Sequence, residues 1–179
     1  MLEKTEGIVL NSIKYGDSSK IIQVFTKNLG KISFIAKGAY NTKSKFGASL
    51  EPTTLAYFTF YNKPNVDLYL LSNSELIQSF SNLSKFQENL IYAMMILECI
   101  YLTQEPKVKN EKLFNHLLSS LIYITDTSNS PFNIFCYFMY LLSSDMGFAI
   151  SLNNDLLPDS DYYIDFQDGN IKFWDNLTL

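Results

Sequence analysis

The residues best suited to chemistry in this 179-residue chain are lysines, and they gather in its first fifty positions. That stretch holds eight lysines against three acidic residues, which leaves it with a net charge of +5, whereas the whole chain carries −4. All fourteen basic residues are lysine, which meets phosphate as a point charge without the paired donors of arginine. The distribution favours sequence-independent binding to a phosphate backbone. An AT-rich genome also enriches lysine, so charge alone leaves this function open.

The candidate DNA contacts combine lysines with two aromatic side chains that can stack on bases. A solvated basic loop is the alternative for the lysines near residues 37–45, and Tyr57 and Tyr61 are weaker stacking candidates. The expected DNA-binding residues are Lys14, Lys20, Lys31, Lys37, Tyr40, Lys43, Lys45 and Phe46.

Catalytic groups are scarce by comparison. His116 is the only histidine, so no Ser/His/Asp or Cys/His set can be assembled, and no glycine-rich nucleotide loop is present. The tail carries several carboxylates, but their spacing does not fit an EF-hand and a solvated acidic loop is expected. We therefore expect no enzyme and no cofactor. The enzymatic alternative is a nuclease that uses a metal held by Asp155, Asp159, Asp161, Asp165 and Asp168.

The first eighty residues alternate apolar and polar side chains in short runs separated by turn residues. Five such strands in about 75 residues indicate a small closed barrel. We predict an OB-fold, a five-stranded antiparallel barrel over residues 1–80, with strands at Gly7–Ile13, Lys20–Thr26, Lys31–Lys37, Thr53–Tyr61 and Asp67–Ser72.

The period becomes helical after residue 80, so the fold class is α+β, with an all-helical domain over residues 81–179. Ser84 is the expected N-cap of a first helix, with Gln87 reaching back to it. A second helix is predicted over Asn110–Asp126. A third, apolar nearly all round and therefore expected to be central, runs from Pro131 to a C-cap at Gly147. A small C-terminal β-hairpin is expected at about 162–174.

The location of the protein follows from the absence of apolar targeting patterns. The start MLEKTEGIVL lacks the apolar region of a secretory signal, and no apolar stretch is long enough to span a bilayer. Cys99 and Cys136 lie far apart in helical patterns, as expected of buried, reduced thiols. We expect a cytoplasmic, nucleoid-associated protein without membrane contact.

A series of short motifs in the N-terminal third resembles the RecO family of recombination mediators. The motifs follow one another in family-like order over residues 4–52, and a looser likeness extends through Leu76-Ile77 and Leu97-Glu98. They are Lys4–Leu10, Tyr15–Ser18, Phe25-Thr26, Gly30-Lys31, Ala36–Ala39, Lys43–Phe46 and Leu50–Pro52.

The resemblance implies a function in DNA repair by binding alone. It implies that the chain binds and anneals single-stranded DNA, engages the C-terminal tail of the single-stranded DNA-binding protein, and works with RecR to load RecA. That tail is acidic and apolar, so we assign it to the lysines between the first two helices, Lys107, Lys109 and Lys112. The alternative is a protein–protein adaptor with weak or no direct DNA binding.

Two departures from the family pattern bear on these expectations. Many members carry arginine where this chain has Lys20 and Tyr40, so the second position loses its charge. Many members also carry a four-cysteine zinc site, whereas this chain has no cysteine beyond Cys136. Zinc sites need clustered Cys or His ligands, so we expect no zinc. We expect the C-terminal β-hairpin to remain although the zinc ligands are absent.

Overall fold

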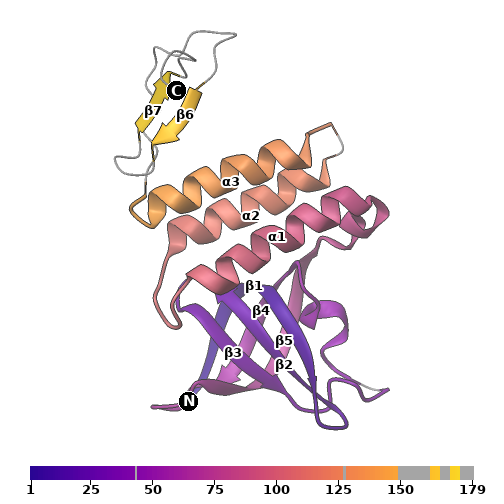
Figure 1. The fold of residues 1–179 in the computed structure, drawn as a ribbon. Coiled ribbons are helices and arrows are strands. Elements are labelled where there is room, and N and C mark those ends of the chain that lie inside the picture. Colours follow the sequence, from indigo (N-terminus) through magenta and orange to yellow (C-terminus); the bar gives the residue numbers. More distant parts are fainter. Residues whose placement is uncertain (43, 127, 149–161, 166–169, 174–179) are drawn as a thin grey trace. The chain divides into compact units, whose positions relative to one another are not determined.

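The structure is a computed structural model that describes residues 1–179 apart from 43, 127, 149–161, 166–169 and 174–179 (Figure 1). The chain forms two compact units, Met1–Phe135 and Cys136–Leu179. The first unit holds five strands and the first two α-helices. The α+β class predicted from the sequence is confirmed.

The five N-terminal strands close into a barrel in the order β1-β2-β3-β5-β4. β1 pairs with both β2 and β4, which closes the ring, and a 3-10 helix at Gly47–Leu50 precedes β4. The strands are β1 (Leu2–Tyr15), β2 (Ser19–Thr26), β3 (Gly30–Ala36), β4 (Thr54–Tyr61) and β5 (Leu68–Ser79).

The alternation that predicts the strands reflects burial inside the barrel. Along β3 every second residue is buried, from Gly30 to Ala36. Phe34 lies at the centre of the core, with its ring centroid 5.5 Å from that of Phe58 and 5.1 Å from that of Phe60. Side chains on alternate positions of a strand point to opposite faces, so the remaining residues of β3 face outward.

Two details of the barrel differ from the prediction. The pairing of β3 with β5 is parallel, so the barrel is not wholly antiparallel. β1 and β5 are also longer than expected, with 14 and 12 residues. Sequence alternation reveals the strands but not which partner each one meets across the barrel, because pairing is set by contacts distant in sequence.

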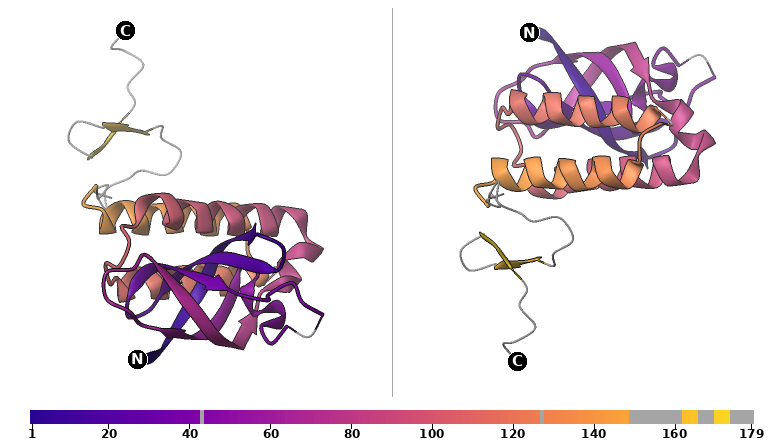
Figure 2. Two further views of the ribbon diagram at one scale, coloured as in Figure 1. Left: turned by 90° about the horizontal axis from the view of Figure 1, so that it is seen from below. Right: turned by 90° about the horizontal axis from the view of Figure 1, so that it is seen from above.

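Helices α1 (Gln87–Thr103) and α2 (Glu111–Thr125) lie side by side over one end of the barrel (Figures 1 and 2). The Asn110 side chain caps α2 by accepting a hydrogen bond from the Leu113 N–H at 3.0 Å. The ring of Phe114 from α2 lies 6.3 Å from that of Phe25 on β2.

The predicted cap of the first helix is wrong. Ser84 lies in a 3-10 helix, Ser81–Lys85, and α1 begins after Phe86, an N-cap without a side-chain hydrogen bond. The residue types favour a cap at Ser84, but the chain turns once more before the α-helix starts.

Helix α3 (Pro131–Asp145) begins at the predicted proline and ends before Gly147, whose φ of 85° suits the C-cap role. Of its residues Phe138 and Leu142 are buried, whereas Tyr137 is 62% exposed. Cys136 is also exposed and Cys99 only half-buried, contrary to the expectation of two buried thiols.

Two further strands, β6 (Tyr162–Asp165) and β7 (Asn170–Phe173), pair in antiparallel register in the segment where the hairpin was expected. The four residues between them lie outside the described part of the chain. Within the described residues no helix is long and apolar enough to cross a membrane.

Candidate nucleic-acid interface

Four of the predicted DNA-binding residues meet where β1 turns into β2. Lys14 and Lys20 are cross-strand partners, and Lys37 directly follows Ala36, the partner of Lys20 on β3. The Nζ atoms of Lys14 and Lys20 lie 5.8 Å and 5.2 Å from the centre of the Tyr40 ring. We call Lys14, Lys20, Lys37 and Tyr40 the hairpin-end cluster.

A backbone contact holds Tyr40 in this cluster. Its N–H donates to the carbonyl oxygen of Ser18 at 3.0 Å, which ties the loop after β3 to the β1–β2 turn. Gly38 has a φ of 71°, a left-handed conformation that glycine adopts without strain, and this bends the chain away from β3 toward the turn. The Tyr40 side chain remains 48% exposed.

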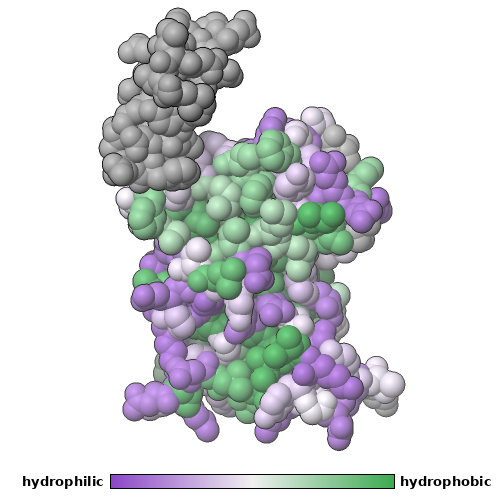
Figure 3. Space-filling view, viewed as in Figure 1, coloured by the Kyte–Doolittle hydropathy of each residue, from purple (hydrophilic) through white to green (hydrophobic). Residues whose placement is uncertain are grey.

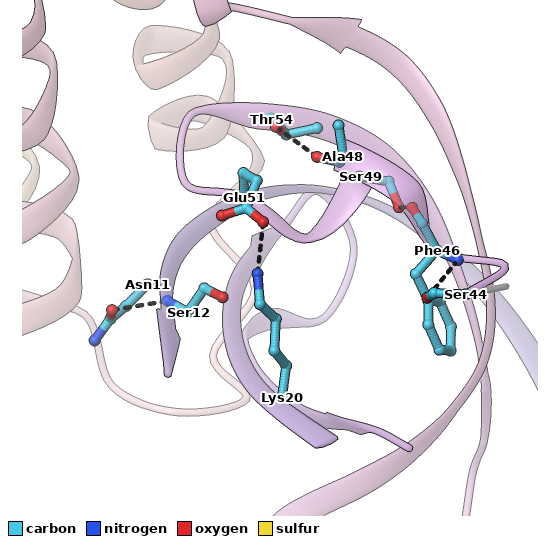
Figure 4. A network of polar contacts seen from close by, with 9 residues as sticks. All are labelled: Asn11, Ser12, Lys20, Ser44, Phe46, Ala48, Ser49, Glu51 and Thr54. Atoms are coloured by element: carbon cyan, nitrogen blue, oxygen red, sulfur yellow. Dashed lines mark hydrogen bonds and ion pairs between the residues drawn. The ribbon is translucent and has the colours of Figure 1, made fainter. Parts of the chain in front are cut away.

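The charge of Lys20 is already used within the protein. Its Nζ donates to Glu51 Oε1 at 2.5 Å, a contact visible in Figure 4, and the residue is only 9% exposed. Lys14 and Lys37 are exposed and have no acidic partner among the described residues. The free positive charge of the cluster therefore comes from Lys14 and Lys37.

The second predicted stacking residue is not available to a base. Phe46 is 4% exposed and belongs to the barrel core. Figure 4 shows its backbone N–H bonded to Ser44 Oγ, and its carbonyl oxygen accepts from Ser49 Oγ. Phe46 is thus a core residue, and its expected role in stacking is wrong.

The rest of that loop contributes one described lysine. Lys45 is exposed, with its Nζ 5.4 Å from the centre of the Phe46 ring. Lys43 lies outside the described residues.

Lys31 lies at the other end of β3 from Lys37, apart from the hairpin-end cluster. Its Nζ donates to the carbonyl oxygen of Tyr101 at 2.5 Å and lies 5.2 Å from the centre of the Tyr101 ring. Partial burial lowers the pKa of its ammonium group from the usual value. The sequence predicts one DNA-binding set that includes Lys31, Lys14 and Lys37, but the length of β3 separates Lys31 from the other two.

The three lysines assigned to a protein partner differ in their surroundings. Lys107 Nζ donates to Asp67 Oδ1 and to the carbonyl oxygen of Val66, both at 2.8 Å. The hydrogen bond to Asp67 raises the pKa of Lys107, and in return lowers the pKa of Asp67. Lys109 pairs with Glu111 at 3.1 Å, while Lys112 has no acidic partner among the described residues; all three lysines are exposed.

One exposed aromatic residue is not among those predicted from the sequence. Tyr15, the last residue of β1, is 54% exposed beside the cluster. The sequence signal for an exposed ring was a large aromatic residue at the edge of a turn, since a turn provides no core in which to bury the ring. Tyr57 and Tyr61 are also exposed on β4, with Lys4 Nζ 4.6 Å from the centre of the Tyr57 ring, but Lys4 is paired with Glu75.

The described residues contain no group of three or more His, Cys, Asp or Glu side chains placed to hold a metal. His116 lies on α2, half-buried, and its Nε2 has no hydrogen-bond partner. The tail where zinc or a nuclease metal was considered is largely outside the described residues, so the structure does not test those expectations.

Two family models match the chain in succession. The model described as "Recombination protein O N terminal" matches residues 1–80, the barrel, and "Recombination protein O C terminal" matches residues 87–162.

Curated relatives named "DNA repair protein RecO" are similar to most of this chain. The protein from Acetivibrio thermocellus is 36% identical over 82% of this chain and 57% of its own length. The protein from Salinibacter ruber is 32% identical over 82% of this chain and 56% of its own. The protein from Prosthecochloris aestuarii is 28% identical over 97% of this chain and 70% of its own length. The chain thus spans little more than half the length of the first two relatives. Together the two models and these identities show that the chain belongs to the RecO family of DNA repair and recombination proteins.

Proposed function

We propose that this chain is a non-enzymatic recombination mediator that binds single-stranded DNA at the hairpin end of an OB-fold. The closed order β1-β2-β3-β5-β4 supports the OB-fold assignment. In OB-folds the loop between the first two strands is a common site of oligonucleotide binding. The hairpin-end cluster lies at that loop in this chain.

One observation carries the proposal. Lys14 and Lys37 are exposed without acidic partners among the described residues, and Lys14 Nζ lies 5.8 Å from the centre of the exposed Tyr40 ring. Two free cations beside an aromatic face are what a single strand needs, because phosphates meet the cations while a base stacks on the ring. Tyr15 offers a second ring at the same turn. Lys20 supports the cluster indirectly, since its bond to Glu51 fixes the strand from which the cluster projects.

Binding of this kind supplies no chemistry of its own. Each neutralised phosphate releases a counterion, and this release drives association with any sequence. Screening the charge of two strands held together would favour annealing, which we propose as the activity of the barrel.

The partners we propose are the C-terminal tail of the single-stranded DNA-binding protein, and RecR, with RecA loaded as the outcome. For the tail, Lys112 is the cation of the proposed set that has no acidic partner among the described residues. Lys107 and Lys109 would release Asp67 and Glu111 to bind the acidic tail. Such a mediator would work in the cytoplasm on nucleoid DNA.

An adaptor with little direct DNA binding is the second candidate. It is favoured by the Lys20–Glu51 ion pair, because this lysine of the predicted DNA-binding set already has an acidic partner. It is also favoured by hydrophobic side chains exposed on α1, among them Ile91 and Met95. Figure 3 shows hydrophobic surface, coloured green, in the region of the helices.

The experiment compares binding of a labelled oligonucleotide by three forms of the chain in fluorescence anisotropy at low salt. Lys14→Glu/Lys37→Glu is expected to weaken binding about a hundredfold, because replacing a lysine at a phosphate by a glutamate costs about tenfold at low salt. Lys85→Glu/Lys112→Glu carries the same charge change at exposed sites away from the cluster and is expected to bind nearly as the wild type. Equal weakening by both pairs would show a general charge effect and refute the proposed site.

A further inference from the structure

A cavity lies between the barrel and the end of α1, outside the hairpin-end cluster. It has a volume of about 500 Å³. Its walls come from the outer faces of β2 and β3, the connection before β5, and the segment that leads from α1 into α2. All these elements belong to the first compact unit.

Uncharged hydrogen-bonding groups form the barrel side of this cavity. Gln23 and Ser33 are cross-strand partners on β2 and β3, and both face it. The Oε1 atom of Gln23 is buried and has no hydrogen-bond partner. A buried acceptor without a donor costs free energy, so this atom is a site where a ligand N–H would be stabilised.

Two lysines line the same cavity. Lys31 is held by Tyr101 at the end of α1, and Lys107 by Asp67. Both Nζ groups bond to oxygen atoms of the protein and leave further donor hydrogens, because an ammonium group has three. With Asp67 counted, these three residues leave the lining with a net positive charge.

The α1–α2 connection turns what would be an open face into a pocket. The outer face of the second and third strands is where OB-folds commonly hold oligonucleotides. Here the Lys107 N–H donates to the Lys31 carbonyl oxygen at 3.0 Å, so the connection runs along the edge of β3. Gly30 permits this approach, since a Cβ there would lie 2.1 Å from the Val108 carbonyl oxygen. The connection covers part of this face and leaves the cavity of about 500 Å³ beside it.

We propose that this cavity receives one nucleotide of the bound strand, with its base against Gln23 and Ser33 and its phosphate at Lys31. The proposal rests on the proposed binding of single-stranded DNA by the barrel. A base brings flat donors and acceptors to the uncharged wall, and its phosphate brings the negative charge that Lys31 attracts.

The geometry of β3 connects this pocket to the hairpin-end cluster. Lys31 and Lys37 lie six positions apart along an extended strand, a span of about 20 Å. Single strands occupy about 4–16 nucleotides on one OB-fold, so one strand can reach both sites. This continuity favours a nucleotide over a peptide as the occupant.

The test uses the full chain and an oligonucleotide that carries 2-aminopurine, a base whose fluorescence responds to its surroundings. Ser33→Tyr fills the pocket and Gln23→Leu removes its acceptor, while Ser119→Tyr makes the same change as the first at an exposed site on α2. We expect wild type and Ser119→Tyr to change the fluorescence on binding. Both pocket variants should abolish that change and bind about tenfold more weakly, the effect expected when one base is no longer held. Thermal melting checks that each variant is folded.

The outcomes separate the pocket from the proposed function. If the folded pocket variants bind and report like wild type, the pocket does not hold a nucleotide, although DNA binding by the cluster stands. If wild type binds no oligonucleotide at low salt, both proposals fail. If instead an acidic peptide with a free carboxyl terminus binds wild type and not Ser33→Tyr, while DNA binding is the same in both, the pocket is a peptide site and the nucleotide assignment is overturned.

Discussion

Lys14 and Lys20 face each other across the β1–β2 hairpin, yet only one of them has a charge free for a ligand. Lys20 is 9% exposed and bonded to Glu51, whereas Lys14 is exposed. The partner of Lys20 lies 31 residues away in sequence, so no local pattern reveals the pairing. Residue type and charge density predict where the cluster lies, but only the structure separates its free lysines from its structural one.

The two aromatic candidates also divide into a structural residue, Phe46, and a residue available to a ligand, Tyr40, and this division is testable. Phe46→Ala should lower the free energy of unfolding by about 3–5 kcal/mol, as for other buried phenylalanines. Tyr40→Ala should change stability little, because its ring is half exposed, but should weaken oligonucleotide binding about tenfold. Chemical denaturation and anisotropy on both variants measure the two effects. A stable Phe46→Ala variant with impaired DNA binding would reverse these roles.

The ion pair of Asp67 with Lys107 predicts a pH dependence. The hydrogen bond from Lys107 holds the pKa of Asp67 below its usual 3.8. Because the folded pKa is the lower one, the stabilisation is present above the unfolded pKa and disappears as the pH falls through the folded value.

An NMR titration of the Asp67 carboxyl group checks this sign. Lys107→Met should raise the pKa of Asp67 toward its usual value, while Lys63→Met, a nearby exposed lysine without an acidic partner among the described residues, should leave it unchanged. An unchanged pKa in Lys107→Met would mean that the pair does not form in solution.

At the scale of elements, strand and helix periods predict most of the fold. The β3 alternation and the start of α2 beside Asn110 depend on neighbouring residues, so the sequence reveals them. The parallel β3–β5 pairing depends on which distant strands meet, and a one-dimensional pattern does not contain that information.

The close approach of the α1–α2 connection to β3 gives a prediction about elements. Gly30 and Gly16 both have positive φ angles, 71° and 60°, but an added Cβ meets the Val108 backbone only at Gly30. Gly16→Ala should cost about 1 kcal/mol from backbone strain. Gly30→Ala should cost about 2 kcal/mol more, because backbone atoms must move apart. Equal losses of stability in chemical denaturation would show that the connection does not rest against β3.

At the scale of the whole molecule, the net charge of −4 conceals a local concentration of positive charge. The chain is acidic overall, but its first fifty residues are basic, and folding brings Lys14 and Lys37 together at one end of the barrel. A local cationic surface on an acidic protein attracts phosphate where it is needed and repels it elsewhere. The family membership and this surface both favour single-stranded DNA as the ligand.

The most direct test of this account is the salt dependence of the affinity for a single-stranded oligonucleotide, in wild type and in Lys14→Glu/Lys37→Glu. Log affinity should fall linearly with log salt, with a slope of about −0.7 per phosphate neutralised. The slope in the variant should be shallower by about 1.4, because two phosphates are no longer neutralised. No binding at low salt, or the same slope in both proteins, would contradict the claim that these lysines hold the DNA backbone.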